Sequence, residues 1–381
     1  MDRIATYDDP LSGLATAVTF NERLAIVHKE LNRRCPGVAR MAIALHDRHT
    51  GLLKTFAASP AEESPLRNYE TSLADARSLH DLAKLHRPRI VHDLGVFVDG
   101  AHEHTRRILG HGFASSYTLP VFDGGELVGF VFCDSLHKGY FRNGVLDQTE
   151  VFTQLLAQLV INDQKIIRTL NGALRTAIGM VHVRDPETGS HLERMARFSR
   201  LIARELVSRG KCVLDDEQIE QLFNFAPLHD IGKLGIPDHI LYKPGKLVAD
   251  ERTVMDTHTL IGRRIVDEMI INFGFGRLPY IESLRAIVEY HHETLDGCGY
   301  PHGLKGREIP VEAQIVAVSD VFDALTTTRP YKGSWPNPHA IAMLQLLAID
   351  KLDGTCVEIL IDCQDEVASI QQHFAETEQA A

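Results

Sequence analysis

Residues 224–247 read NFAPLHDIGKLGIPDHILYKPGKL, and this stretch decides how the rest of the chain is interpreted. At its centre His229 and Asp230 are adjacent, and Lys233 follows three residues later. Burying an imidazole and a carboxylate at the end of an apolar run is costly unless a partner binds them. A divalent cation is one such partner, and a capped helix end is the other explanation of a lone His-Asp pair. The remaining polar residues of the chain decide between the two.

The composition is typical of a soluble globular protein with two or three domains. The chain has 381 residues, of which 44% are hydrophobic and 24% are charged, and its formal net charge is −11. No basic block stands out, which argues against a nucleic-acid polymer as a partner. The N-terminus lacks the apolar core of a signal peptide, and no apolar run reaches the roughly 20 residues of a membrane span. We therefore expect a cytoplasmic protein with no membrane contact and six reduced cysteines.

Residues 21–160 carry the pattern of a mixed α/β domain. An amphipathic helix is expected at 22–33, and strands at 40–46 and 51–57 flank a turn. Two further β-rich runs, 116–122 and 126–133, surround Asp-Gly-Gly, which is a strong hairpin signal. This order resembles a GAF sensor domain. The resemblance implies a pocket for an unknown small ligand or a dimerisation module.

Ten of the 20 histidines lie in this half of the chain. His102 and His104, in the run AHEH, leave a metal or haem site open beside the alternative of solvated loop histidines. Cys133 lies alone in a predicted strand, and we interpret it as a core residue rather than a chromophore attachment point.

From Asp147 to Val181 the apolar periodicity becomes helical. Apolar residues recur at spacings of three and four, with one break at Asp163. We predict one long helix, or two nearly continuous ones, that connects a sensor domain to an effector domain. The expected boundaries are 1–150 for the first domain, 151–181 for the connecting helix and 182–381 for the second domain. Such a seam often pairs with its copy in a homodimer, and packing on its own domains is the alternative.

Residues 182–372 are predicted to be nearly all helical, with loops rich in Gly and Pro between the helices. The expected helices are 191–208, 216–227, 248–272, 280–292, 310–328 and 337–349. The fold class is therefore multidomain, with an α/β GAF-like domain, a long connecting helix and an all-α C-terminal domain.

Histidines and carboxylates interrupt these apolar helices at their ends or on their faces. The set comprises Glu187, His191, His229, Asp230, His258, His291, His292, Asp320 and Asp323. A single histidine in such a place is usually a hydrogen-bonded core residue. Five of them with four carboxylates in one helical domain indicate a metal site.

Several motifs together resemble the HD-GYP family. They are HDIGK at 229–233, IPDHIL at 236–241, KPGKL at 243–247, HHETLDGCGYP at 291–301, GLKGREIP at 303–310 and SDVFDALTTTRPYK at 319–332. The resemblance covers about 180 residues from Met180 onward. HD-GYP proteins are bacterial phosphodiesterases that degrade the second messenger cyclic di-GMP, so the resemblance implies this activity and an HD superfamily fold.

The resemblance also implies the metal ligands. The first metal would be held by His191, His229, Asp230 and Asp320. Asp230 would bridge to a second metal, held by His258, His291 and His292. Glu187 matches a position that accompanies a third metal in some members, so two or three ions stay open. Mixed imidazole and carboxylate ligands suit iron or manganese.

Catalytic roles follow from the same resemblance. Asp230 would set the spacing of the metals, which activate a water for attack on phosphorus. Lys233 would reach a phosphate oxygen and stabilise the developing charge. Arg329 and Lys332 are placed near the substrate phosphates or guanine.

Tyr300 and Asp323 complete the expected substrate contacts. Gly299-Tyr300-Pro301 lies in a loop that would shape the substrate site, and in the family it is implicated in contact with GGDEF-type cyclases. Two departures from the family pattern stand out. Residues 352–362 (LDGTCVEILID) put the C-terminal helix packing in doubt, and the segment between His258 and His291 is long.

Three functions stay open at this level. The first is a cyclic di-GMP hydrolase, gated by the GAF-like domain, with pGpG or GMP as the end product. The second is the same catalysis on cyclic GMP-AMP or a linear dinucleotide, because metals grip phosphate and not base. The third is a receptor that binds cyclic di-GMP without hydrolysing it.

Overall fold

The computed structural model describes residues 9–61, 64–97, 102–181, 189–274, 279–327 and 333–375. The chain divides into two compact units. The first comprises Met1–Ile166 with Asp215–Glu217, and the second comprises Ile167–Leu214 with Gln218–Ala381. Each unit has its own hydrophobic core.

The first unit is built on a six-stranded antiparallel sheet in the order β3-β2-β1-β6-β5-β4. Its strands are β1 (Arg40–Asp47), β2 (Leu52–Ser59), β3 (Glu70–Ser72), β4 (Arg89–Val91), β5 (Ser115–Asp123) and β6 (Glu126–Ser135). The hairpin of β5 and β6 turns at Gly124 and Gly125, which have φ of 57° and 91°. Glycine adopts such angles without steric cost, so the expected Asp-Gly-Gly hairpin is confirmed.

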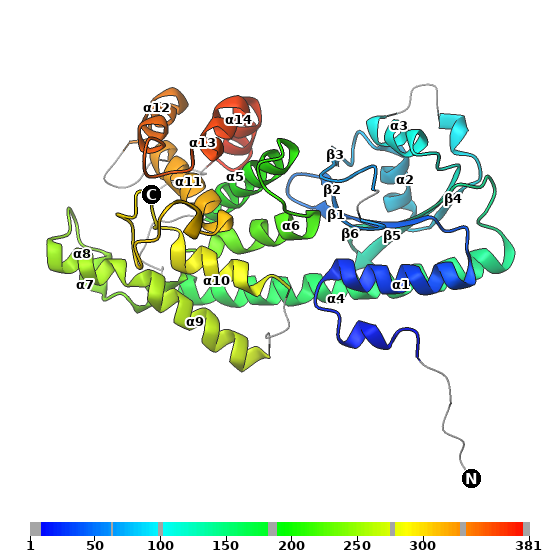
Figure 1. Cartoon of the computed structure of the whole chain (residues 1–381), viewed down its shortest axis with the longest axis horizontal. Helices are drawn as coiled ribbons and strands as arrows, with labels where there is room; N and C mark the ends of the chain where they lie inside the picture. Colours follow the sequence, from blue (N-terminus) through cyan, green and yellow to red (C-terminus); the bar gives the residue numbers. More distant parts are fainter. Residues whose placement is uncertain are drawn as a thin grey trace, which may run out of the picture. The chain divides into compact units, whose positions relative to one another are not determined.

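Two helices cover one face of this sheet, and two shorter ones lie on the other (Figure 1). The first pair is α1 (Phe20–Arg34) and the first half of α4 (Asn143–Val181), which bury Leu24 and Leu156 against Ile43 of β1. The second pair is α2 (Arg77–Leu85) and α3 (Glu103–Gly110). Strand residues alternate between faces, so Met41, Ile43 and Leu45 join the α1 side while the residues between them face α2 and α3.

Helix α4 is one continuous helix of 39 residues, and the expected break at Asp163 has a structural reason. Asp163 forms an ion pair with Arg23 of α1, and the two side chains are only 12% and 17% exposed. An ion pair therefore interrupts the row of apolar residues at this position, and the helix continues through it. Its role as a connector between domains stays a prediction.

Helices make up the second unit, and no strand occurs among its described residues. They are α5 (Gly189–Ser208), α6 (Asp216–Phe225), η4 (Ala226–Leu228), η5 (Ile231–Gly235), α7 (Asp238–Leu241), α8 (Ala249–Asp256), α9 (His258–Phe273), α10 (Ile281–Tyr290), η7 (Gly306–Glu308), α11 (Val311–Thr326), α12 (Asn337–Leu347), α13 (Gly354–Asp362) and α14 (Gln364–His373). No helix among the described residues is both long and apolar enough to cross a bilayer.

The structure differs from two predictions for this unit, which concern the helix at 248–272 and the packing of residues 352–362. The single helix expected at 248–272 is two helices, because side chains capture the last carbonyls of α8. Thr257 Oγ1 donates to Val254 O at 2.6 Å, and His258 Nδ1 donates to Met255 O at 2.8 Å. The divergent segment 352–362 contains the whole of α13, whose Val357 and Leu360 lie in the core. The C-terminal packing is therefore intact in spite of the unusual sequence.

The ion pair between α1 and α4 gives a stability prediction. Arg23→Met leaves the mostly buried carboxylate of Asp163 unpaired, and we expect it to cost the first unit about 2 kcal/mol. The double variant Arg23→Met/Asp163→Leu should recover most of this loss, because it removes both charges and completes the apolar seam.

Scanning calorimetry of the full chain measures the transition of this unit, with the exposed Arg106→Met as the control. Equal losses in the single and double variants would show that the pair does not govern this contact.

Candidate metal centre

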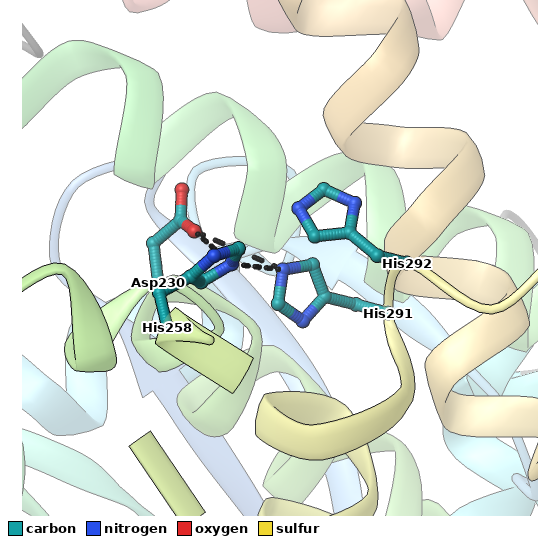
Figure 2. Close-up of side chains that lie close together, drawn as sticks. All are labelled: Asp230, His258, His291 and His292. Carbon is teal, nitrogen blue, oxygen red and sulfur yellow. Dashed lines mark hydrogen bonds and ion pairs between the residues drawn. The ribbon is translucent and has the colours of Figure 1, made fainter. Parts of the chain in front are cut away.

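Seven of the eight expected metal ligands converge in the second unit. They form two groups, and within each group the ligand atoms lie within 4.8 Å of one another. One group is Asp230, His258, His291 and His292, and the other is His191, His229 and Asp320. Figure 2 shows the first group, with the rings of His258 and His291 beside the Asp230 carboxylate.

Five segments that are distant in sequence supply these residues. His191 lies in α5 and Asp320 in α11, while His229 and Asp230 lie between η4 and η5. His258 begins α9, and His291 and His292 directly follow α10. Only the folded helical unit therefore assembles the site.

Backbone carbonyls orient three of the histidines. The Nδ1 atoms of His229, His258 and His291 lie 3.0, 2.8 and 2.9 Å from the carbonyls of Ala226, Met255 and Ile287. A carbonyl only accepts hydrogen bonds, so each Nδ1 carries the proton. The Nε2 lone pair of each ring then points into the site, which is the tautomer that a metal ligand requires.

His191 is oriented by a carboxylate. Its Nδ1 donates to Asp323 Oδ2 at 2.6 Å, and Arg194 Nε donates to Asp323 Oδ1 at 2.6 Å. The Asp323 side chain has no exposed surface. This corrects the expectation that Asp323 contacts substrate, because a fully enclosed carboxylate behind His191 positions that histidine instead. Arg194 was not predicted from the sequence. It could have been, because it follows His191 by three residues on a predicted helix and therefore lies beside it.

Several buried atoms of the site lack hydrogen-bond partners. His191 Nε2, His229 Nε2 and Asp230 Oδ1 are of this kind. His229 Nε2 lies 3.1 Å from Asp230 Oδ2, and His258 Nε2 lies 3.2 Å from Asp230 Oδ1. Unsatisfied buried donors and acceptors are costly, so this set of atoms fits a bound cation.

The electrostatics of the site also favour a cation. Burial acts to raise the pKa of Asp230, but Lys233 and His229 hold it well below its usual range. Burial acts to lower the pKa of His229, whereas Asp230 and Asp320 raise it to about 9. Burial lowers the pKa of His291, and that of His292 well below its usual value. The carboxylates therefore attract positive charge, while His291 and His292 stay neutral and keep their lone pairs.

Two glycines allow the backbone to approach closely at this site. A β-carbon on Gly232 would lie 1.7 Å from the carbonyl oxygen of His258, so only glycine lets η5 pack against the start of α9. A β-carbon on Gly299 would lie 2.4 Å from the amide nitrogen of Thr294. The glycines of HDIGK and GYP thus place the ligand segments rather than react.

Lys233 and Tyr300 border the first ligand group. Lys233 Nζ lies 2.7 Å from Asp230 Oδ2, and the ring of Tyr300 lies 4.8 Å from that of His292. The loop that carries Tyr300 is held by Glu293, which accepts hydrogen bonds from the amides of His302 and Leu304 at 2.7 and 2.9 Å. Sequence reasoning did not single out Glu293.

Three expected site residues lie outside the described residues. They are Glu187, the candidate ligand of a third ion, and the cations Arg329 and Lys332. Their predicted roles stay predictions.

The helical unit contains a match to a known protein family. Residues 177–356 match the family model of the HD domain. A Vibrio cholerae protein named "Probable cyclic di-GMP phosphodiesterase" is 38% identical over 203 residues, which cover 53% of this chain and 46% of the relative. The cyclic di-GMP phosphodiesterase response regulator RpfG of Xanthomonas campestris pv. campestris is 37% identical over 222 residues, which cover 58% of this chain and 54% of the relative.

A third relative has another printed substrate. The 3'3'-cGAMP-specific phosphodiesterase 2 of Vibrio cholerae is 35% identical over 191 residues, covering 50% of this chain and 34% of the relative. The chain thus spans about half the length of these curated relatives, or less. It also resembles the GAF domain of an Acinetobacter phosphoenolpyruvate-protein phosphotransferase, at 11% identity and a TM-score of 0.30 over 41% of this chain and 91% of that one. A score this low carries no argument, and the GAF-like assignment stays a prediction.

The place of Asp323 gives a prediction that separates the two roles considered for it. Asp323→Asn weakens the orientation of His191, and we expect metal affinity to fall about 10- to 100-fold. Competition of Mn²⁺ against a chelator measures this affinity, with the exposed Asp350→Asn as the control. Unchanged metal affinity together with a raised substrate KM would show instead that Asp323 contacts substrate.

Proposed function

We propose that the second unit hydrolyses a cyclic dinucleotide in a metal-dependent reaction, with cyclic di-GMP as the substrate. The observation that carries the proposal is the convergence of imidazole and carboxylate atoms in two ligand groups. Three of these atoms, His191 Nε2, His229 Nε2 and Asp230 Oδ1, are buried and have no hydrogen-bond partner. The match to the HD domain and the similarity to proteins named as cyclic di-GMP phosphodiesterases support this substrate.

The metal ions are part of the proposal. One would be held by His191, His229, Asp230 and Asp320, and the other by Asp230, His258, His291 and His292. Glu187 would contribute to a third. The described donor groups contain imidazole and carboxylate but no thiolate, which favours iron or manganese. Bound ions would supply Lewis-acid activation of water and of the phosphodiester.

The chain's own residues would bind and orient the substrate. Lys233, whose Nζ lies 2.7 Å from Asp230 Oδ2, would donate to a phosphate oxygen and stabilise its developing charge. Tyr300 would line the substrate side of His292, and Arg329 and Lys332 would contact the phosphates or guanine. Water attack on one phosphorus displaces a sugar oxygen and opens the ring to pGpG, and a second hydrolysis gives GMP.

A second substrate has a specific observation in its favour. The relative named as specific for 3'3'-cGAMP is 35% identical, close to the identity of the cyclic di-GMP phosphodiesterases. The ligand groups bind phosphate and not base, so cyclic GMP-AMP is the alternative substrate.

The remaining parts of the proposal concern regulation and partners. The GAF-like first unit would regulate hydrolysis, and α4 would transmit the signal and pair with its copy in a homodimer. Its single run of 39 helical residues supports this role. The Gly299-Tyr300-Pro301 loop would contact GGDEF-type cyclases.

Hydrolysis is tested directly on protein purified without oxygen. We expect chromatography to show conversion of cyclic di-GMP to pGpG or GMP, and the double variant His229→Ala/Asp230→Ala to lose more than about 100-fold in kcat/KM. His239→Ala, at an exposed position ten residues on, should stay within about twofold of wild type.

Two other results would contradict the proposal. Metal-loaded protein that binds cyclic di-GMP but leaves it intact would indicate a receptor. Faster turnover of cyclic GMP-AMP than of cyclic di-GMP would make the former the substrate.

A further inference from the structure

The first unit contains a cavity that the proposed hydrolysis does not use. Its volume is about 120 Å³, and it lies on the face of the sheet that α2 and α3 adjoin. Residues of all six strands line it on the sheet side, and residues of α2, η2 (Leu94–Phe97), α3 and the loop before β3 line the other side. It is enclosed within this one unit.

Strand register explains why the space is open. The cavity-lining residues of β1 include Ala42 and Ala44, whose small side chains leave room above the sheet. Ala42 is opposite Phe132 of β6, and Phe132 is opposite Thr118 of β5. Large and small residues therefore alternate across the floor, and the alanines leave the hollow.

The floor of the cavity carries a closed ion pair. Arg40 of β1 is opposite Asp134 of β6, and Arg40 Nη1 lies 2.5 Å from Asp134 Oδ2. Each residue is only 3% exposed. These two charges cancel, and Asp134 is the only carboxylate among the described residues that line the cavity.

Arg89 adds a second guanidinium to the cavity, and the described lining residues include no carboxylate that pairs with it. It lies on edge strand β4, opposite Thr118. Its Nε is buried and has no hydrogen-bond partner. Burial lowers the pKa of Arg89. A guanidinium stays protonated even so, and the described lining residues together carry one net positive charge.

His104 of α3 adds a further unsatisfied group. Its Nδ1 is buried without a hydrogen-bond partner, and the residue lines the same cavity as Arg89. Burial lowers the pKa of His104, and His102 and Arg89 lower it further. A neutral imidazole can donate one hydrogen bond without adding charge. A metal or haem site had been left open for the AHEH histidines, and this cavity gives His104 a different use, because Arg89 repels a cation.

We propose that this cavity binds a small monocarboxylate with an apolar body about the size of a benzene ring, its carboxylate on Arg89 and His104. A carboxylate matches the planar guanidinium with two hydrogen bonds and cancels the single excess charge. The rest of the lining is largely apolar, including Leu53, Leu94 and Ile108. A cavity of about 150 Å³ holds benzene, so the size of this one sets a similar limit. A doubly charged phosphate would leave one negative charge buried and unpaired.

The test measures binding by titration calorimetry on the full, metal-loaded chain, independently of hydrolysis. The probes are benzoate, phenylacetate and hexanoate, each compared with its neutral amide. We expect at least one carboxylate to bind about tenfold or more tightly than its amide, because charged hydrogen bonds are the stronger ones. If no carboxylate binds more tightly than its amide, the proposal is wrong.

Arg89 variants locate the site. Arg89→Met should abolish the preference for carboxylate, and Arg89→Lys should reduce it because the ammonium lacks the two-pronged geometry. Arg87→Met, at an exposed position two residues away, should leave it unchanged. A carboxylate preference that survives in both Arg89 variants would place binding elsewhere and overturn the assignment.

A stability measurement separates a binding role of Arg89 from a structural one. Because this half-buried guanidinium has no carboxylate partner among the described residues of the cavity, Arg89→Met should raise the melting temperature of the first unit without ligand. A structural arginine would lower it. Benzoate should raise the melting temperature of wild type and leave that of Arg89→Met unchanged. If Arg89→Met melts lower and Arg89→Lys binds as wild type does, the site is not built around this guanidinium.

Discussion

The helical unit depends on the hydrogen bonds that hold the outer nitrogen of each buried histidine. Three Nδ1 atoms donate to carbonyls within the chain turn that carries the histidine, and His191 donates to Asp323. These bonds determine the tautomer and the ring plane together, so the Nε2 atoms converge before any ligand arrives. These fixed histidine positions restrict the conformation of the neighbouring backbone. It explains why α9 begins at His258 and why residue 232 is glycine.

Buried polar groups also explain which parts of the site could be predicted from the sequence. His229, Asp230, His291 and His292 stand at the ends of apolar runs, where unpaired polar residues demand a partner, so their convergence could be predicted. Asp320 and Asp323 both looked like site residues because they lie one turn apart on α11. A step of three residues turns the helix by about 300°, so the two side chains point in directions about 60° apart. Asp320 therefore faces the ligands, while Asp323 faces α5 and its Arg194.

The first unit could be predicted as a pattern of strands but not as a site. Periodicity and the Asp-Gly-Gly turn were enough for β1, β2, β5 and β6. The break at Asp163 was visible, yet its partner Arg23 is 140 residues away, and nothing local indicates such a pair. The same holds for the cavity. The charges of Arg40 and Asp134 cancel each other because the two residues are opposite in the sheet, whereas Arg89 is opposite Thr118. This cross-strand register is not specified by a single sequence.

The central claim is that the Nε2 atoms of these histidines, with Asp230 and Asp320, bind divalent ions. Anomalous diffraction from crystals of anaerobically purified protein, recorded at the iron and manganese edges, tests it most directly. We expect two peaks bridged by Asp230, one among His258, His291 and His292 and the other among His191, His229 and Asp320. The claim would be contradicted if neither ligand group held a metal ion in protein that still hydrolyses cyclic di-GMP. In that case His229 Nε2 would be hydrogen-bonded to a carboxylate instead.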